Sequence, residues 1–130
     1  ADHYFLCRSA ESALHISEGG AVVVGVVVTY EPDLAKLDVL LSALRQQLTK
    51  VVVVDNGSSL DIERSLSAAL RSDAWCQVVR QHSNLGIAAA QNIGIELARK
   101  AGAAFVILFD QDSPLRIWFQ NSVRLQALNR

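Results

Sequence analysis

A short apolar run that ends in two carboxylates constrains the fold of this chain most strongly. Residues Phe105 to Phe109 are consecutively apolar, and Asp110 and Asp112 follow them one residue apart. A run of this length, with β-branched and aromatic members, is typical of a strand covered on both faces in a parallel sheet. Ligands of open α/β sheets collect just beyond the carboxyl ends of such strands. The run therefore predicts a ligand site at its end, although a strand end followed by a helix N-cap would explain the same acids.

Three earlier segments are also predicted strands, and each is followed by a predicted helix. Residues 21–29 and 51–54 are nearly continuous valine, and residues 76–80 form a shorter third strand. Apolar residues then recur at helical spacing, at Leu34, Leu37, Leu40, Leu41, Leu44 and Leu48, at Ile62, Leu66, Ala69 and Leu70, and at Ile87, Ala90, Gly94, Leu97 and Ala101. This alternation predicts an α/β protein with a Rossmann-like, open and mostly parallel sheet that carries helices on both faces.

The starts of the first two helices carry capping signals. Asp33 follows Pro32 and is expected to cap the first helix. Ser58 and Asp61 have the spacing of a capping box for the second helix.

The two ends of the chain are less regular. Residues 1–20 are predicted to be a leader or tail with a short helix at 10–16, and residues 21–130 form the organised domain. After Pro114, a closing helix is expected to carry Leu115, Trp118, Phe119, Val123, Leu125 and Leu128. His3 and His15 are expected at the surface because neither has a metal-ligating partner at a suitable spacing.

Composition excludes several classes of function. The chain has 130 residues, enough for one domain, and a net charge of -1 without basic runs, so no nucleic-acid partner is expected. No apolar run is long enough to cross a bilayer. Cys7 and Cys76 lack metal-ligand spacing and are expected to be reduced thiols of a cytosolic protein, with Cys76 in the core. His82 is expected to be a turn residue.

Polar residues follow three of the four predicted strands. They are Thr29 and Tyr30, then Asp55, then Asp110 with Asp112. The carboxyl ends of parallel strands meet at one edge, so these residues are expected to converge on a nucleotide-type ligand. No glycine-rich dinucleotide fingerprint or P-loop lysine follows the first strand. Asp55 also has a plainer interpretation, as an acceptor for backbone amides in its own turn.

Four motifs together resemble the family 2 glycosyltransferases of the GT-A fold, and more narrowly the bacterial rhamnosyltransferases that build O-antigen and related surface polysaccharides. The similarity covers Val22 to Ser113. The motifs are Val28-Thr29-Tyr30-x-Pro32, Val54-Asp55-Asn56-Gly57-Ser58, Asn84-Leu85-Gly86-Ile87-Ala88 with Asn92-Ile93-Gly94-Ile95, and Asp110-Gln111-Asp112-Ser113.

The resemblance implies roles for the residues after the first two strands. Thr29, Tyr30 and Glu31 fall where the family lines its nucleoside pocket. Asp55 falls on the acid that hydrogen-bonds the pyrimidine, and a carboxylate suits a ring N–H as its acceptor.

The resemblance also implies a diphosphate and metal site. Asn84 and Gly86 fall on the loop that approaches the ribose and diphosphate. Asp110 would face the ribose or the water shell of a metal, and Asp112 would hold Mg²⁺ or Mn²⁺ against the diphosphate, a hard cation that suits oxygen ligands.

The implied activity is inverting, metal-dependent transfer of a sugar from a dTDP-linked donor to a saccharide or lipid-linked saccharide acceptor. L-Rhamnose from dTDP-L-rhamnose is the expected donor sugar, although another nucleotide sugar remains an alternative. The catalytic base is unknown and is expected downstream of Arg130, so this chain is expected to be a donor-binding half that lacks the acceptor-binding half. Its exposed apolar surface is expected to favour self-association. Its expected location is the cytoplasm or the inner face of the plasma membrane.

Two other functions are consistent with parts of the sequence. One is a non-catalytic nucleotide-binding or assembly module with the same half-fold. The other is a haloacid-dehalogenase-like phosphatase, whose two catalytic acids also stand two apart after a strand. In that family the acids follow the first core strand, whereas Asp110 follows the fourth predicted strand here.

Overall fold

The computed structural model describes residues 3–5, 22–70, 73–111 and 123–125, with the backbone alone described at 3–5, 110 and 123–125. The elements are β1 (His3–Phe5), β2 (Val23–Thr29), α2 (Leu34–Arg45), β3 (Lys50–Asp55), α3 (Leu60–Leu70), β4 (Cys76–Arg80), α4 (Ile87–Lys100), β5 (Phe105–Asp110) and β6 (Val123–Leu125).

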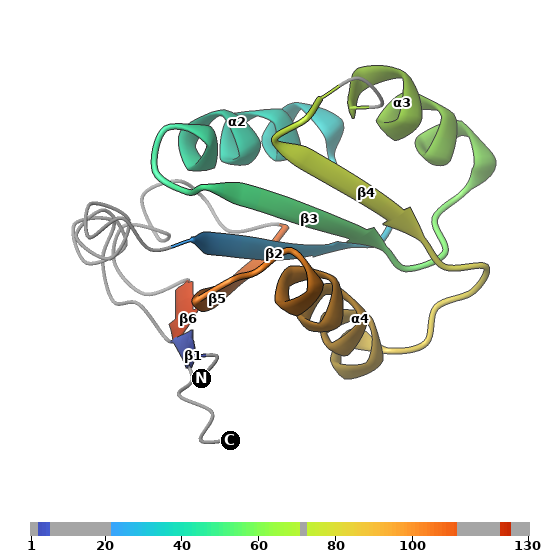
Figure 1. The fold of residues 1–130 in the computed structure, drawn as a ribbon. Coiled ribbons are helices and arrows are strands. Elements are labelled where there is room, and N and C mark those ends of the chain that lie inside the picture. The colour runs from blue at the N-terminus through green and yellow to red at the C-terminus, as the bar shows by residue number, and fades with distance from the viewer. Residues whose placement is uncertain (1–2, 6–21, 71–72, 112–122, 126–130) are drawn as a thin grey trace.

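Within these residues the sheet has the strand order β1-β5-β2-β3-β4, with parallel neighbours throughout, and β6 pairs antiparallel with β5. Helices α2 and α3 cover one face and α4 covers the other (Figure 1). The predicted α/β, Rossmann-like architecture is confirmed.

The valine-rich strands supply two hydrophobic cores because both faces of the sheet are covered. Val23, Val27, Val51 and Val53 point toward the leucine stripe of α2, which buries Leu37, Leu40, Leu41 and Leu44. The alternate valines Val24, Val26, Val52 and Val54 point toward α4, where they meet Ala90 and Ala98. Successive side chains of a strand point to opposite faces, so an unbroken valine run serves both cores at once.

Helix α4 lies unusually close to the sheet at Gly94. A Cβ atom added there would lie 2.3 Å from Cγ1 of Val26 and 3.2 Å from Cγ2 of Val54. The absence of a side chain at Gly94 is what permits this close approach. Ala90 and Gly94 are buried as predicted and Leu97 packs against the core. The two ends of the predicted face differ, because Ile87 is 59% exposed and Ala101 is exposed.

The two predicted helix caps have different outcomes. The carboxylate of Asp33 accepts hydrogen bonds from the amides of Ala35 (3.0 Å) and Lys36 (3.1 Å), so its prediction is confirmed. The capping box at Ser58 is wrong, because α3 begins at Leu60 and the hydroxyl of Ser58 bonds instead to Asp55. Ala69, predicted to face inward, is exposed, while Leu66 is buried.

Both chain ends contribute a strand that the sequence pattern does not indicate. Residues 3–5, within the predicted leader, form β1 and pair with residues 105–107 of β5. Val123 and Leu125 lie in β6, so their assignment to a closing helix is wrong. The backbone of β5 offers hydrogen-bonding partners on the side away from β2, and this pairing outweighs a weak helical period. Cys7, His15, the predicted helix at 10–16 and residues 114–119 and 128 lie outside the described residues.

Among the described helices, none combines the length and the apolar character that a membrane span requires.

Cys76 is buried at the start of β4, as predicted, with 4% of its surface exposed. Burial, with a further contribution from the charge of Asp73, raises the pKa of its thiol to about 12. The thiolate is the reactive form, so alkylation of native Cys76 at pH 8 is expected to be at least about a hundredfold slower than in the unfolded chain. Iodoacetamide labelling of a Cys7→Ser variant, with and without denaturant, measures this. Equal rates under both conditions would contradict the described burial.

Candidate functional site

The register of three neighbouring strands brings the predicted polar residues to one edge of the sheet. Thr29 is the Cα partner of Asp55, and Val28 is the partner of Asp110. Strands β2, β3 and β5 run parallel, so all three end on the same side, which we call the carboxyl edge. The backbone positions of Thr29, Asp55 and Asp110 therefore meet as the sequence predicts. Asp112 lies outside the described residues.

The carboxylate of Asp55 is the best-anchored group at this edge. It is 1% exposed and accepts hydrogen bonds from the hydroxyl of Thr29 (2.8 Å), the hydroxyl of Ser58 (2.6 Å) and the amide of Ser58 (3.0 Å). Two of these bonds reach Oδ1 and one reaches Oδ2. A carboxylate has about four lone-pair sites, so Oδ2 retains acceptor capacity for a ligand. Asp55 thus accepts hydrogen bonds within its own turn, as the plainer interpretation requires, and its Oδ2 can still accept a hydrogen bond from a ligand.

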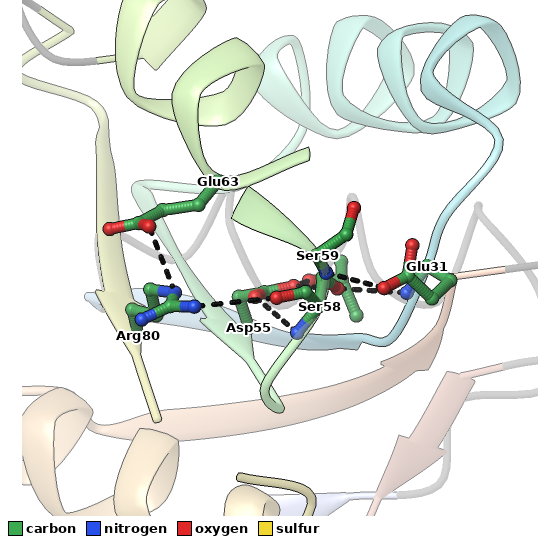
Figure 2. A network of polar contacts seen from close by, with 7 residues as sticks. Glu31, Asp55, Ser58, Ser59, Glu63 and Arg80 are labelled. Atoms are coloured by element: carbon green, nitrogen blue, oxygen red, sulfur yellow. Dashed lines mark hydrogen bonds and ion pairs between the residues drawn. The ribbon is translucent and has the colours of Figure 1, made fainter. Parts of the chain in front are cut away.

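Glu31 braces the loop after β2 against the start of α3. Its amide donates to the Ser58 hydroxyl (2.8 Å), and its carboxylate accepts a hydrogen bond from the amide of Ser59 (Figure 2). Its φ of +44° is a conformation that residues other than glycine rarely adopt. In this structure Glu31 therefore holds two loops together.

A cavity of about 280 Å³ lies between α3 and the edge strand β4, and Asp55 is one of its lining residues. We call it the α3 cavity. This volume is close to the lower end of the ~300–1,000 Å³ range of small-molecule sites. Its lining residues are Asp55, Glu63, Leu66, Ser67, Leu70, Cys76, Val78 and Arg80.

Arg80 carries positive charge to the α3 cavity beside Asp55, because the two residues are Cα partners on the neighbouring strands β4 and β3. Its Nε lies 3.3 Å from Oε2 of Glu63, an ion pair that lacks hydrogen-bond geometry, and its Nη2 donates to the carbonyl of Ser58 at 3.4 Å (Figure 2). Both side chains of the pair are about one-third exposed, so the pair itself adds little stability. Arg80 supplies only donors and Asp55 only acceptors, so the two together suit a ligand edge that has one of each.

Tyr30 has an exposed side chain and a firmly held backbone. Its amide donates to Oε1 of Gln111 (2.8 Å), and its carbonyl accepts from Nε2 of the same side chain (3.0 Å). The side-chain amide of Gln111 thus imitates a peptide group and extends the β2–β5 pairing beyond Val28 and Asp110. This contact ties the loop that carries the Asp-x-Asp motif to the loop that carries Tyr30.

Asparagine side chains organise the loop before α4. The side chain of Asn56 donates to Oδ1 of Asn84 (3.0 Å) and accepts from the amide of Leu85 (3.0 Å). Oδ1 of Asn84 also accepts from the amide of Gly86 (2.9 Å). Gly86 has a φ of +87°, and an added Cβ would meet nothing within 4 Å. The loop therefore leaves open space beside Gly86 that a ligand can approach.

Three side chains of this site were not identified from the sequence: Arg80, Glu63 and Gln111. Arg80 had a usable signal, because it ends a predicted strand at the same edge as Asp55. Glu63 and Gln111 had no such signal in the sequence, since their roles depend on partners in other elements. His82, predicted to be a turn residue, is not among the lining residues of the α3 cavity.

The predicted metal ligands are Asp110 and Asp112. The structure describes only the backbone of Asp110, and Asp112 lies outside the described residues. In the part of the chain that the structure covers, no group of three or more His, Cys, Asp or Glu residues is placed to hold a metal ion. Asp110 ends β5 at the carboxyl edge, a position compatible with the predicted metal site.

This parallel sheet, with polar side chains gathered at its carboxyl edge and helices on both faces, defines a Rossmann-like α/β domain, and the chain belongs to glycosyl transferase family 2. The family model matches residues 23–116, which contain β2 to β5 with the helices between them. The phosphatase alternative is thereby set aside.

One curated protein similar to this chain is the dTDP-rhamnosyl transferase RfbF of Shigella flexneri, which is 39% identical over 94 residues. The aligned residues are 72% of this chain and 30% of that protein, so the chain spans less than a third of the relative's length.

Proposed function

We propose that this chain binds the nucleotide of a dTDP-linked sugar, with the pyrimidine in the α3 cavity. The observation that carries the proposal is the buried carboxylate of Asp55 in the lining of a cavity of ligand size. Asp55 would accept the ring N3–H, and Arg80 would donate to the neighbouring C4 carbonyl oxygen. The similarity to a dTDP-rhamnosyl transferase supports thymidine as the nucleoside and L-rhamnose as the sugar.

The diphosphate would extend from the α3 cavity along the carboxyl edge toward Gly86 and the end of β5. Asp110 and Asp112 would hold Mg²⁺ or Mn²⁺ there, since carboxylates are the ligands these cations prefer. A bound cation would offset the negative charge of the departing diphosphate. The contact between Gln111 and Tyr30 supports this arrangement because it keeps the two loops in register.

The proposed reaction is displacement at the anomeric carbon of the sugar. An acceptor hydroxyl oxygen bonds to that carbon from the face opposite the diphosphate, the bond to the diphosphate breaks, and the configuration inverts. The proton of the hydroxyl passes to a base that we do not assign to any described residue. The acceptor would be a saccharide or lipid-linked saccharide of a surface polysaccharide, at the cytoplasmic side of the membrane.

Calorimetric titration of the chain tests the proposal directly. dTDP is expected to bind, with tighter binding when Mn²⁺ is present, whereas GDP is expected to bind at least about tenfold more weakly because a purine does not match the α3 cavity. A magnesium-free titration with EDTA serves as the control for trace metal. Absence of binding by dTDP and UDP under both conditions would refute the nucleotide site.

A further inference from the structure

Three hydrogen bonds run head to tail from the loop after β5 to the carboxylate of Asp55. Nε2 of Gln111 donates to the carbonyl of Tyr30 at 3.0 Å. The amide of Glu31 donates to the hydroxyl of Ser58 at 2.8 Å, and that hydroxyl donates to Oδ1 of Asp55 at 2.6 Å (Figure 2). The Tyr30 carbonyl and the Glu31 amide belong to one peptide group, so the series is continuous. We call these three bonds the loop relay.

The loop relay joins the two ends of the proposed nucleotide site. It begins at Gln111, which stands in the sequence between Asp110 and Asp112, the acids proposed to hold a cation. It ends at Asp55, the carboxylate proposed to hold the base. Hydrogen bonds that point in the same direction along a series polarise one another, so the loss of one bond weakens the others.

The centre of the loop relay is a strained residue with contacts on both sides. Glu31 has a φ of +44°, and a non-glycine residue keeps such a conformation only where its surroundings hold it. On one side, the amide of Tyr30 donates to Oε1 of Gln111 at 2.8 Å, a second bond to the same side chain. On the other side, the carboxylate of Glu31 accepts a hydrogen bond from the amide of Ser59. If the contact with Gln111 is broken, rotation of the peptide group relieves the strain and weakens the bond to Ser58.

We propose that the loop relay makes a divalent cation at the loop after β5 and a pyrimidine nucleoside at Asp55 bind cooperatively. Gln111 is the positioning residue of this coupling, because it acts on Asp55 through the Tyr30–Glu31 peptide group and Ser58. A cation held by the acids on either side of Gln111 favours the hydrogen-bonded arrangement, and a ligand at Asp55 favours the same arrangement. The inference rests on the nucleotide binding proposed above and adds how the two ends of that site communicate.

Thymidine tests the coupling because it has no phosphate. A cation bridges to the diphosphate of dTDP directly, whereas any effect of Mn²⁺ on thymidine affinity passes through the protein. We expect saturating Mn²⁺ to tighten thymidine binding about fivefold or more in calorimetry, within the usual range of coupling between two sites. Because such coupling is reciprocal, thymidine is expected to tighten Mn²⁺ binding by the same factor. The electron paramagnetic resonance signal of free Mn²⁺ measures the second effect.

Two glutamine substitutions locate the coupling. Gln111→Met keeps the length and flexibility of the side chain but removes both hydrogen bonds to Tyr30. It is expected to reduce the effect of Mn²⁺ on thymidine affinity to less than about twofold. Gln77→Met makes the same change at an exposed position of β4, outside the lining of the α3 cavity, and is expected to keep the wild-type effect. A structural defect alone would lower thymidine affinity equally with and without Mn²⁺ and leave the factor between them unchanged.

The outcomes separate the inference from the function on which it rests. If Mn²⁺ does not raise thymidine affinity in a chain that binds dTDP, the coupling is overturned and nucleotide binding stands. An unchanged Mn²⁺ effect in a folded Gln111→Met variant overturns the coupling as well. Binding of neither dTDP nor thymidine refutes both proposals. If Gln111→Met does not fold, the calorimetric and resonance measurements on the wild-type chain still decide.

Discussion

Replacing Asp55 by alanine is expected to lower the free energy of unfolding by roughly 3–5 kcal/mol. The substitution removes the acceptor of three hydrogen bonds and leaves the Thr29 hydroxyl and the Ser58 amide buried without that partner. Urea unfolding followed by circular dichroism measures the change. A loss below about 1 kcal/mol would show that these bonds are not formed as described.

Replacing Asp55 by asparagine separates the structural role of this residue from its role in binding. The amide keeps the shape of the side chain and one acceptor, so the expected loss of stability is smaller, about 1–2 kcal/mol. The charge-assisted bond to the pyrimidine is lost, and the affinity for dTDP is expected to fall by at least about tenfold. Asp61→Asn, the same charge change at an exposed position of α3, is the matched control and should retain binding. Full dTDP affinity in Asp55→Asn would remove Asp55 from the binding site.

Replacing Gly57 by alanine is expected to destabilise the fold by about 3 kcal/mol or more and to disturb the loop of Asn84. Gly57 has a φ of +86°, and an added Cβ would lie 2.6 Å from the carbonyl carbon of Ser83 and 2.8 Å from the amide nitrogen of Asn84. These are backbone atoms, so the two loops must separate to make room. Separation would break the contact between Asn56 and Asn84.

Gly102 provides the control for backbone strain at Gly57. Its φ is +84°, and an added Cβ would meet nothing within 4 Å. Gly102→Ala is therefore expected to cost only the strain of a left-handed alanine, about 1–2 kcal/mol. The difference between the two variants in thermal or urea unfolding reports the crowding alone. Equal losses of unfolding free energy in the two variants would show that the loops around Gly57 accommodate the added Cβ atom without cost.

The type and order of the central elements follow from local pattern. Continuous valine in β2 and β3 indicates strands covered on both faces, and leucine at helical spacing identifies α2. The Asp33 cap also follows from sequence because its partners lie two and three residues away. The meeting of Thr29, Asp55 and Asp110 at one edge was predictable as well, since parallel strands with helical crossovers must end together.

Features that depend on distant partners were not predictable. Ser58 has the sequence of a helix cap, yet its hydroxyl donates to Asp55 and accepts a hydrogen bond from the amide of Glu31 in the loop after β2. Val123 and Leu125 belong to a run in which a weak helical period was predicted, yet they lie in a strand that pairs with β5. In each case a tertiary contact outweighed a weak local preference.

The sequence by itself determined the alternation of strands and helices, the edge at which polar residues gather and the family resemblance, because these are encoded in short-range periodicity and motif spacing. Only the tertiary structure decided that Arg80 and Asp55 line one cavity with residues of α3 and that Gln111 holds Tyr30 from 81 positions away. The physical reason is that a cavity and a side-chain clamp exist only where separate elements pack. Their positions depend on how α3 packs against β4 and on the register of β5 with β2. Neither can be predicted from a local sequence pattern.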